Sequence, residues 1–183
     1  MKSAVLDRYI ECLKTFNEHT NIYSKKAYDH LPFHMQDSVN IAMLIGDKPL
    51  NIVDLGSGSG FPSIPIAVMN PENKVVAIES NGKKAHFLQQ TATELGLKNY
   101  AVLQMDANQL HREKLPIDAI TAKAFKPLSE VVSLAKRIAR HAKLIVPLSL
   151  AQVSLLSDSE KIAIQEQILT DTRYFYYMIP TRN

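Results

Sequence analysis

The chain has 183 residues, of which 46% are hydrophobic and 21% are charged, close to the average for globular proteins. This composition excludes a wholly disordered chain, and Cys12 as the only cysteine excludes an intramolecular disulfide and a multi-thiolate zinc site. The 21 Lys and Arg residues against 18 Asp and Glu give a net charge of +3, which does not by itself identify a nucleic-acid-binding protein.

The length and the first residues lead us to expect one cytoplasmic domain over residues 1–183, with a helical segment at 1–46 and an α/β core at 50–183. Asp7 and Arg8 interrupt the N-terminal stretch, which therefore does not resemble a signal peptide. No apolar run reaches the roughly 18 residues of a membrane-spanning helix, so we expect no membrane partner.

Helical periodicity is clear in the N-terminal segment. A first predicted helix ends near Asn17, and a second spans 33–45 and ends before Gly46. In the first helix an apolar residue recurs every three or four positions, which places on one face Leu6, Tyr9, Leu13 and Phe16.

From residue 50 onward, short apolar segments alternate with helical ones. The predicted strands span 50–55, 74–79, 100–104, 117–121 and 143–146. The predicted helices end at Met69 or span 82–95, 128–138 and 157–167, and a last strand over 174–179 is expected to be antiparallel at the sheet edge. This alternation predicts an α/β fold whose twisted sheet is mostly parallel and is covered by helices on both faces.

Three of the six glycines lie close together, as Gly56, Gly58 and Gly60, directly after the first predicted strand. Glycine allows positive φ and the close approach of a ligand to the backbone, and open parallel sheets bind ligands at this edge. No lysine follows as in a P-loop, and the Gly-x-Gly-x-Gly spacing differs from the dinucleotide fingerprint. The loop therefore predicts a cofactor site of another kind.

Glu79 ends the second predicted strand, 25 residues after Asp54. A carboxylate at this position can accept two hydrogen bonds from a ribose diol. The alternative is an ordinary solvated acid at the end of a strand. Asp106, Ala107 and Asn108 end the third strand, where an acid followed by small polar residues is also typical of a helix cap.

The pattern Asp54-x-Gly-x-Gly-x-Gly resembles motif I of class I S-adenosylmethionine-dependent methyltransferases. The longer run 54–67, with its Gly-Phe61-Pro62 step, resembles the RsmG/GidB family of bacterial 16S ribosomal RNA methyltransferases. Further segments that are similar to this family include Phe16-Asn17, Asn21-Ile22, His34-Met-Gln-Asp37-Ser38, 79–88 and Ala122-Lys123-Ala-Phe125. The resemblance covers about residues 5–148.

The resemblance implies a Rossmann-like class I methyltransferase fold that transfers a methyl group from S-adenosylmethionine to N7 of one guanine in 16S rRNA. It places the ammonium group of the cofactor at Asp54, its ribose at Glu79 and its adenine at 106–108. The cofactor-binding residues that it implies are Asp54, Gly56, Ser57, Gly58, Gly60, Phe61, Glu79, Asp106, Ala107, Asn108 and Lys123.

The chemistry that the resemblance implies needs no general base and no metal, because N7 is already a nucleophile and the sulfonium is already activated. We expect Lys123 to act in positioning, and His34, Lys83 and Lys126 to contact RNA. The open alternatives are a buried pair of His34 with Asp37, and simple surface charge for the lysines and for the basic cluster at 136–143. The expected partner is 16S rRNA or the small ribosomal subunit, bound by a monomer.

The chain departs from the family pattern at three places. Lys123 stands where the family has Arg, 106–108 reads Asp-Ala-Asn where Arg-Ala-Glu is common, and Pro147-Leu148 replaces a Lys-Gly pair. Two other functions therefore stay open. One is a methyltransferase of the same fold acting on a small molecule or a protein, and the other is a non-catalytic homologue that binds S-adenosylmethionine.

Overall fold

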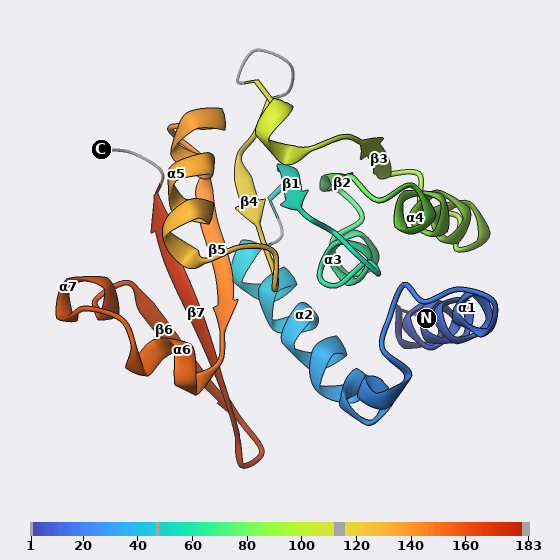
Figure 1. Ribbon diagram of the computed structural model, residues 1–183, viewed down its shortest axis with the longest axis horizontal. Coiled ribbons are helices and arrows are strands. Elements are labelled where there is room, and N and C mark those ends of the chain that lie inside the picture. Colours follow the sequence, from blue (N-terminus) through green and yellow to red (C-terminus); the bar gives the residue numbers. More distant parts are fainter. Residues whose placement is uncertain (1, 47, 112–115, 181–183) are drawn as a thin grey trace.

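The computed structural model describes residues 2–46, 48–111 and 116–180. Its strands are β1 (Asn51–Leu55), β2 (Lys74–Glu79), β3 (Tyr100–Gln104), β4 (Ala119–Thr121), β5 (Lys143–Leu148), β6 (Ile164–Leu169) and β7 (Thr172–Pro180). They form one sheet in the order β3-β2-β1-β4-β5-β7-β6 (Figure 1). The pairs among β1 to β5 are parallel, and β7 is antiparallel to both β5 and β6.

Helices cover both faces of this sheet, as the alternation of segments predicts (Figure 1). The helices are α1 (Lys2–Glu18), η1 (Lys25–His30), α2 (Leu31–Ile45), α3 (Ser63–Met69), α4 (Gly82–Glu94), η2 (Ala107–Gln109), α5 (Leu128–Ile138), α6 (Leu150–Ser154) and α7 (Asp158–Lys161). Side chains of α1 to α4 pack on one face, and those of α5 and α6 pack on the other. No helix in the described ranges is both long and apolar enough to cross a bilayer.

Strand β1 shows how the sequence produces these layers. Val53 and Leu55 belong to the core under α5, whereas Ile52 packs with α2 and α3. Because successive side chains of a strand point to opposite faces, a strand covered on both faces is apolar on both. The carboxyl end of β1 therefore lies at the centre of the sheet with a helix layer on each side.

Asn17 at the end of α1 anchors the segment that follows. Its side-chain nitrogen donates to the carbonyl of Tyr23 at 2.7 Å and to the hydroxyl of Tyr28 at 2.9 Å. Its oxygen accepts from the backbone N–H groups of Ile22 and Tyr23. The side chain is fully buried, so these bonds are shielded from water. They fold residues 22–23 back toward the carboxyl edge of the sheet.

The C-terminal region corrects one prediction. The helix predicted over 157–167 is wrong, because only the single turn of α7 forms and β6 begins at Ile164. A capping box between Ser157 and Glu160 favours the helix start, but the following residues pair with β7 instead. The strand predicted over 174–179 is confirmed as antiparallel, yet β6 and not β7 forms the sheet edge. Pro147 and Leu148 continue β5.

Candidate active site

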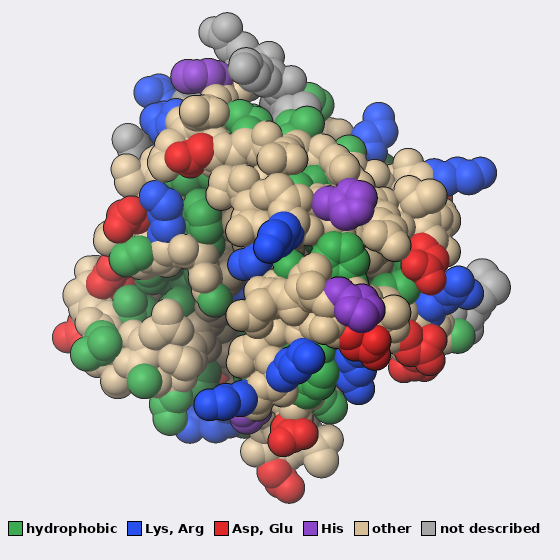
Figure 2. Space-filling view, turned by 45° about the vertical axis from the view of Figure 1, so that its right-hand side comes forward, with side chains coloured by type: hydrophobic (Ala, Val, Ile, Leu, Met, Phe, Trp, Pro, Cys, Tyr) green, Lys and Arg blue, Asp and Glu red, His purple; other side chains and the backbone are tan. Residues whose placement is uncertain are grey.

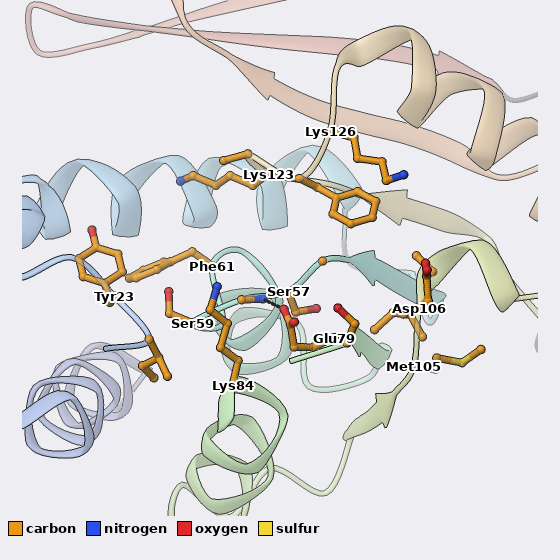
Figure 3. Close-up of a pocket in the computed structure, with 18 of the residues that line it drawn as sticks. Tyr23, Ser57, Ser59, Phe61, Glu79, Lys84, Met105, Asp106, Lys123 and Lys126 are labelled. Atoms are coloured by element: carbon orange, nitrogen blue, oxygen red, sulfur yellow. Dashed lines mark hydrogen bonds between the residues drawn. The ribbon is translucent and has the colours of Figure 1, made fainter. Parts of the chain in front are cut away.

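A cavity of about 540 Å³ opens at the carboxyl ends of β1, β2, β3 and β4 (Figure 3). This is the edge where the glycine loop was expected to form a site, and the volume lies within the range of small-molecule and cofactor sites. The residues that the sequence predicts for the site and that line the cavity are His34, Gly56, Ser57, Gly58, Phe61, Glu79, Asp106, Ala107, Asn108, Lys123 and Lys126.

Three other predicted site residues do not line this cavity. Asp54 is fully buried beneath the loop, where the hydroxyl of Thr121 donates to its Oδ1 at 2.7 Å. Burial raises the pKa of Asp54 to about 6, although the hydrogen bond from Thr121 opposes this shift. Gly60 packs against Ile64. Lys83 is absent from the lining, and its neighbour Lys84 extends into the cavity from α4 (Figure 3).

The glycine loop needs glycine for two different reasons. Gly56 has a φ of +68°, and a Cβ there would overlap the ring of Phe125. Gly58 has a φ of +59°, and a Cβ there would meet nothing closer than the carbonyl of Gly56 at 3.7 Å. Gly56 therefore allows tight packing of the loop, whereas Gly58 leaves open space beside its backbone.

The carboxylate of Glu79 is fixed at the centre of the cavity. Its Oε2 accepts from the N–H of Gly58 at 2.8 Å, and its Oε1 accepts from the N–H of Asn81 at 2.7 Å. The residue is 7% exposed. Each carboxylate oxygen has a further lone pair, so Glu79 can still accept hydrogen bonds from two hydroxyl groups of a ligand.

The end of β3 forms another wall. Asp106 caps η2 by accepting from the N–H of Asn108 at 2.8 Å, which is the alternative that the sequence left open, and its contact with adenine stays a prediction. Arg137 of α5 donates to the carbonyls of Asn108 and Leu110 from the other side. This support was not predicted from the sequence, because Arg137 belongs to a basic cluster in which no local pattern indicates a contact with the end of β3.

The loop after β4 contributes Lys123 and Lys126. The Nζ of Lys123 lies 2.6 Å from Oδ2 of Asp37, and the Oδ1 of Asp37 accepts from the hydroxyl of Tyr176 at 3.0 Å. The two charged side chains are 14% and 5% exposed. Lys126 forms a more exposed ion pair with Glu130.

His34 does not form the buried pair with Asp37 that the sequence left open as the alternative to an RNA contact. Its Nδ1 is buried without a hydrogen-bond partner among the residues that the structure describes. Burial and the nearby charge of Lys123 lower the pKa of His34 to about 4, so the ring is neutral at pH 7. Asp37 pairs with Lys123 because the fold brings the loop after β4 onto α2, a contact that helical spacing cannot predict.

Several lining residues were not predicted from the sequence. They include Ile22, Tyr23, Ser59, Lys84, Met105 and Phe125. Tyr23 reaches the cavity because Asn17 folds the turn after α1. In the sequence, Asn17 in the Phe16-Asn17 segment was the one indication that this turn has a fixed structure. Within the described ranges, no group of three or more His, Cys, Asp or Glu side chains could hold a metal ion.

Solved structures with a similar fold include a SAM-dependent methyltransferase from Aquifex aeolicus, with a TM-score of 0.53 and 20% identity over 78% of this chain and 89% of that one. A mutant of MtNAS in complex with S-adenosylmethionine has a TM-score of 0.65 and 14% identity over 98% and 77% of the two chains. At identities this low the similarity concerns the fold alone. The structural similarity confirms the predicted Rossmann-like class I methyltransferase fold.

Closer relatives are found by sequence. The chain is 38% identical over 135 residues to Ribosomal RNA small subunit methyltransferase G of Nitrosomonas europaea. The aligned residues cover 73% of this chain and 62% of that protein. The chain is 31% identical over 179 residues to the protein of that name from Borrelia duttonii, covering 91% and 84%. The chain thus spans less than two thirds of the length of some relatives. The GidB family model, described as rRNA small subunit methyltransferase G, matches residues 2–170, and the chain belongs to this family.

Proposed function

We propose that this chain binds S-adenosylmethionine in the cavity at the strand ends and transfers its methyl group to N7 of a guanine in 16S rRNA. The observation that carries the proposal is the fixed carboxylate of Glu79 beside the open backbone of Gly58. The names of the relatives, rRNA small subunit methyltransferases, support the RNA substrate.

The residues of the cavity fit the parts of this cofactor. Glu79 would accept hydrogen bonds from the ribose hydroxyls, and the wall at 106–108 would contact the adenine. The backbone of 56–58 would lie against the methionine part, in the space that a side chain at Gly58 would fill. Asp54 is better suited to support the loop from below, because its side chain is fully buried and Ser57 donates to its carbonyl.

When bound, S-adenosylmethionine supplies a methyl group on a positively charged sulfur. The guanine would attack through the lone pair of N7, and the electron pair of the broken carbon–sulfur bond would stay on sulfur, so no residue of the chain has to accept a proton. The chain therefore has to position the two reactants and exclude water. Ile22, Tyr23 and Phe61 provide apolar walls for that purpose.

Positive charge on the surface is available for RNA phosphates. Figure 2 shows Lys, Arg and His side chains spread over one face of the molecule rather than gathered in a single patch. Lys84 and Lys126 line the cavity itself. We infer that separate lysines around the cavity contact the RNA backbone, which contributes affinity but little sequence preference.

The test is methyl transfer to small ribosomal subunits from a strain that lacks this gene. We expect labelled methyl from S-adenosylmethionine to appear on one guanine, located by mass mapping of the rRNA. Subunits from the parent strain, which already carry the methyl group, should accept no label. Binding of the cofactor without labelling of subunits or free rRNA would overturn the RNA substrate and favour a small molecule or a protein. Absence of cofactor binding would overturn the whole proposal.

A further inference from the structure

We propose that the part of the cavity formed by Tyr23, His34, Phe61 and Lys123 is the subsite for the acceptor base, and that Lys123 recognises guanine through its O6 atom. This inference rests on the proposed function and names the contacts that would select its substrate. The ligand class is a purine base with a carbonyl oxygen at C6.

Tyr23, Phe61 and Lys123 lie on the side of the cavity that the cofactor's nucleoside part is not expected to fill, so an acceptor base can bind there. In Figure 3, Tyr23, Phe61 and the amino group of Lys123 lie on one side of Glu79, and Met105 and Asp106 lie on the other. If the nucleoside part of the cofactor occupies the side of Met105 and Asp106, the glycine loop directs the methyl group toward Tyr23 and Phe61. An acceptor base must then enter between the aromatic rings and the loop.

The wall of this part is aromatic, and its rings pack against one another. The ring centroids of His34 and Phe61 are 6.0 Å apart, and those of Tyr23 and Phe61 are 6.4 Å apart. The three rings come from three separate segments, which are the turn after α1, the start of α2 and the glycine loop. Unstacked RNA bases are commonly bound by stacking on such aromatic side chains.

Two buried polar atoms on this wall lack partners. Apart from the ion pair with Asp37, the Nζ of Lys123 has no hydrogen-bond partner in the part of the chain that the structure describes, and neither has Nδ1 of His34. An ammonium group carries three N–H donors, so the contact with Asp37 leaves donors unused. Both side chains line the cavity, although these two nitrogen atoms are themselves inaccessible to solvent. Because buried polar groups are normally hydrogen-bonded, an acceptor on a ligand that the Lys123 side chain turns to meet would complete its hydrogen bonding.

The chemistry of Lys123 favours guanine over adenine. An ammonium group only donates hydrogen bonds, and guanine presents the acceptor O6 next to N7, where adenine presents an amino group. N7 must keep its lone pair for the methyl group, so the contact goes to O6. Asp37 offsets the charge of Lys123 at 2.6 Å, which reduces its repulsion of the positive charge that develops on the base.

The experiment compares two target bases in the same RNA. The guanine that mass mapping identifies is replaced by 2-aminopurine, which keeps N7 and lacks O6. Lys123→Met removes the contact with O6, so it should lower kcat/KM on the guanine RNA about 10- to 100-fold. On the 2-aminopurine RNA, which has no O6, it should lower kcat/KM by less than about threefold. The Kd of S-adenosylmethionine, measured by calorimetry, should stay within about twofold of the wild-type value. Lys98→Met, which changes an exposed lysine, should leave kcat/KM unchanged on both RNAs.

An equal loss on both bases would overturn the inference, whereas a wild-type protein that methylates neither RNA would overturn the proposed function instead. Tyr23→Ala provides a second test that leaves the buried ion pair intact. It should lower kcat/KM about tenfold on both RNAs through lost stacking, and Tyr23→Phe should restore it. Full activity of Tyr23→Ala would also contradict the subsite.

Discussion

The two halves of the cavity are built in different ways. In the half that we assign to the cofactor, strand ends that adjoin in the sheet supply the groups, and backbone N–H groups hold Glu79 and Asp106 in place. In the half that we assign to the acceptor, Tyr23, His34 and Lys123 come from distant segments. Among the described residues, the buried Nδ1 of His34 has no hydrogen-bond partner, and the Nζ of Lys123 has only its ion pair with Asp37. The comparison contrasts a half organised by backbone hydrogen bonds within neighbouring strand ends with a half assembled from side chains of segments far apart in the sequence.

The largest effect that would separate the halves is expected at Gly58. Gly58→Ala should weaken cofactor binding about 100-fold, because the added methyl group fills the space beside the loop. Gly96→Ala is the matched control, since Gly96 also has a positive φ, of +67°, and open space around it. Both variants should lose about 1–2 kcal/mol of stability from backbone strain. Calorimetric titration checks the affinities, and equal Kd values would contradict the assignment of the loop.

A smaller loss is expected at Glu79. Glu79→Gln should weaken cofactor binding about 30-fold, because the side chain loses its charge and one of its two acceptor oxygens. Glu72→Gln, which changes an exposed acid, should leave the affinity unchanged. The same titration measures both variants. An unchanged Kd for Glu79→Gln would show that the ribose is bound elsewhere.

The acceptor half should respond in turnover instead of in cofactor affinity. Tyr176→Phe removes the hydroxyl that holds Asp37, so kcat should fall about 3- to 10-fold while the Kd of S-adenosylmethionine stays constant. Tyr177→Phe, on the opposite face of the same strand, should change neither quantity. Single-turnover kinetics on small subunits gives the measurement. A loss of cofactor affinity in Tyr176→Phe would contradict the assignment of Asp37 and Lys123 to the acceptor half.

The smallest net effect is expected in the dependence of stability on pH, where two pKa shifts oppose each other. The pKa of His34 falls from 6.5 to about 4 on folding, so the unfolded chain binds the proton more readily and stability is lost as pH falls from about 6.5 to 4. The pKa of Asp54 rises from 3.8 to about 6, so the folded chain binds the proton more readily and stability is lost as pH rises over that range.

These opposite effects can be separated by substitution. Compared with the wild type, His34→Gln should make the Tm fall more, or rise less, as pH increases from 4 to 6, because only Asp54 remains. Asp54→Asn should change the slope in the other direction. Thermal unfolding in a pH series checks both variants, and slopes that change in the same direction would contradict the stated pKa shifts.

The sequence predicts more of the cofactor half of the cavity than of the acceptor half. Gly58 and Glu79 were predicted because the glycine loop and the strand end are local patterns, and the structure places both in one cavity. Asp54 and Lys83 share those local patterns but do not line it, since spacing cannot tell which face of a strand or helix turns inward. The roles of all these residues in binding remain predictions.

The contacts of the acceptor half were less accessible to sequence analysis. The hydroxyl of Tyr176 reaches Asp37 across 139 residues of chain, and Lys123 joins them through the loop after β4. No periodicity encodes such contacts. The resemblance to the family identified Lys123 and His34 as candidates, but only the fold shows that Asp37 pairs with the lysine. The misassigned helix at 157–167 has a similar cause, because pairing with β7 overrides the local capping signal.

A crystal structure with S-adenosylhomocysteine, the product that remains after methyl transfer, tests the central claim most directly. We expect the ribose hydroxyls within hydrogen-bond distance of Glu79, the amino-acid part along 56–58, and the sulfur directed toward Tyr23 and Phe61. A ligand bound outside this cavity, or one with its adenine between Tyr23 and Phe61, would contradict the account.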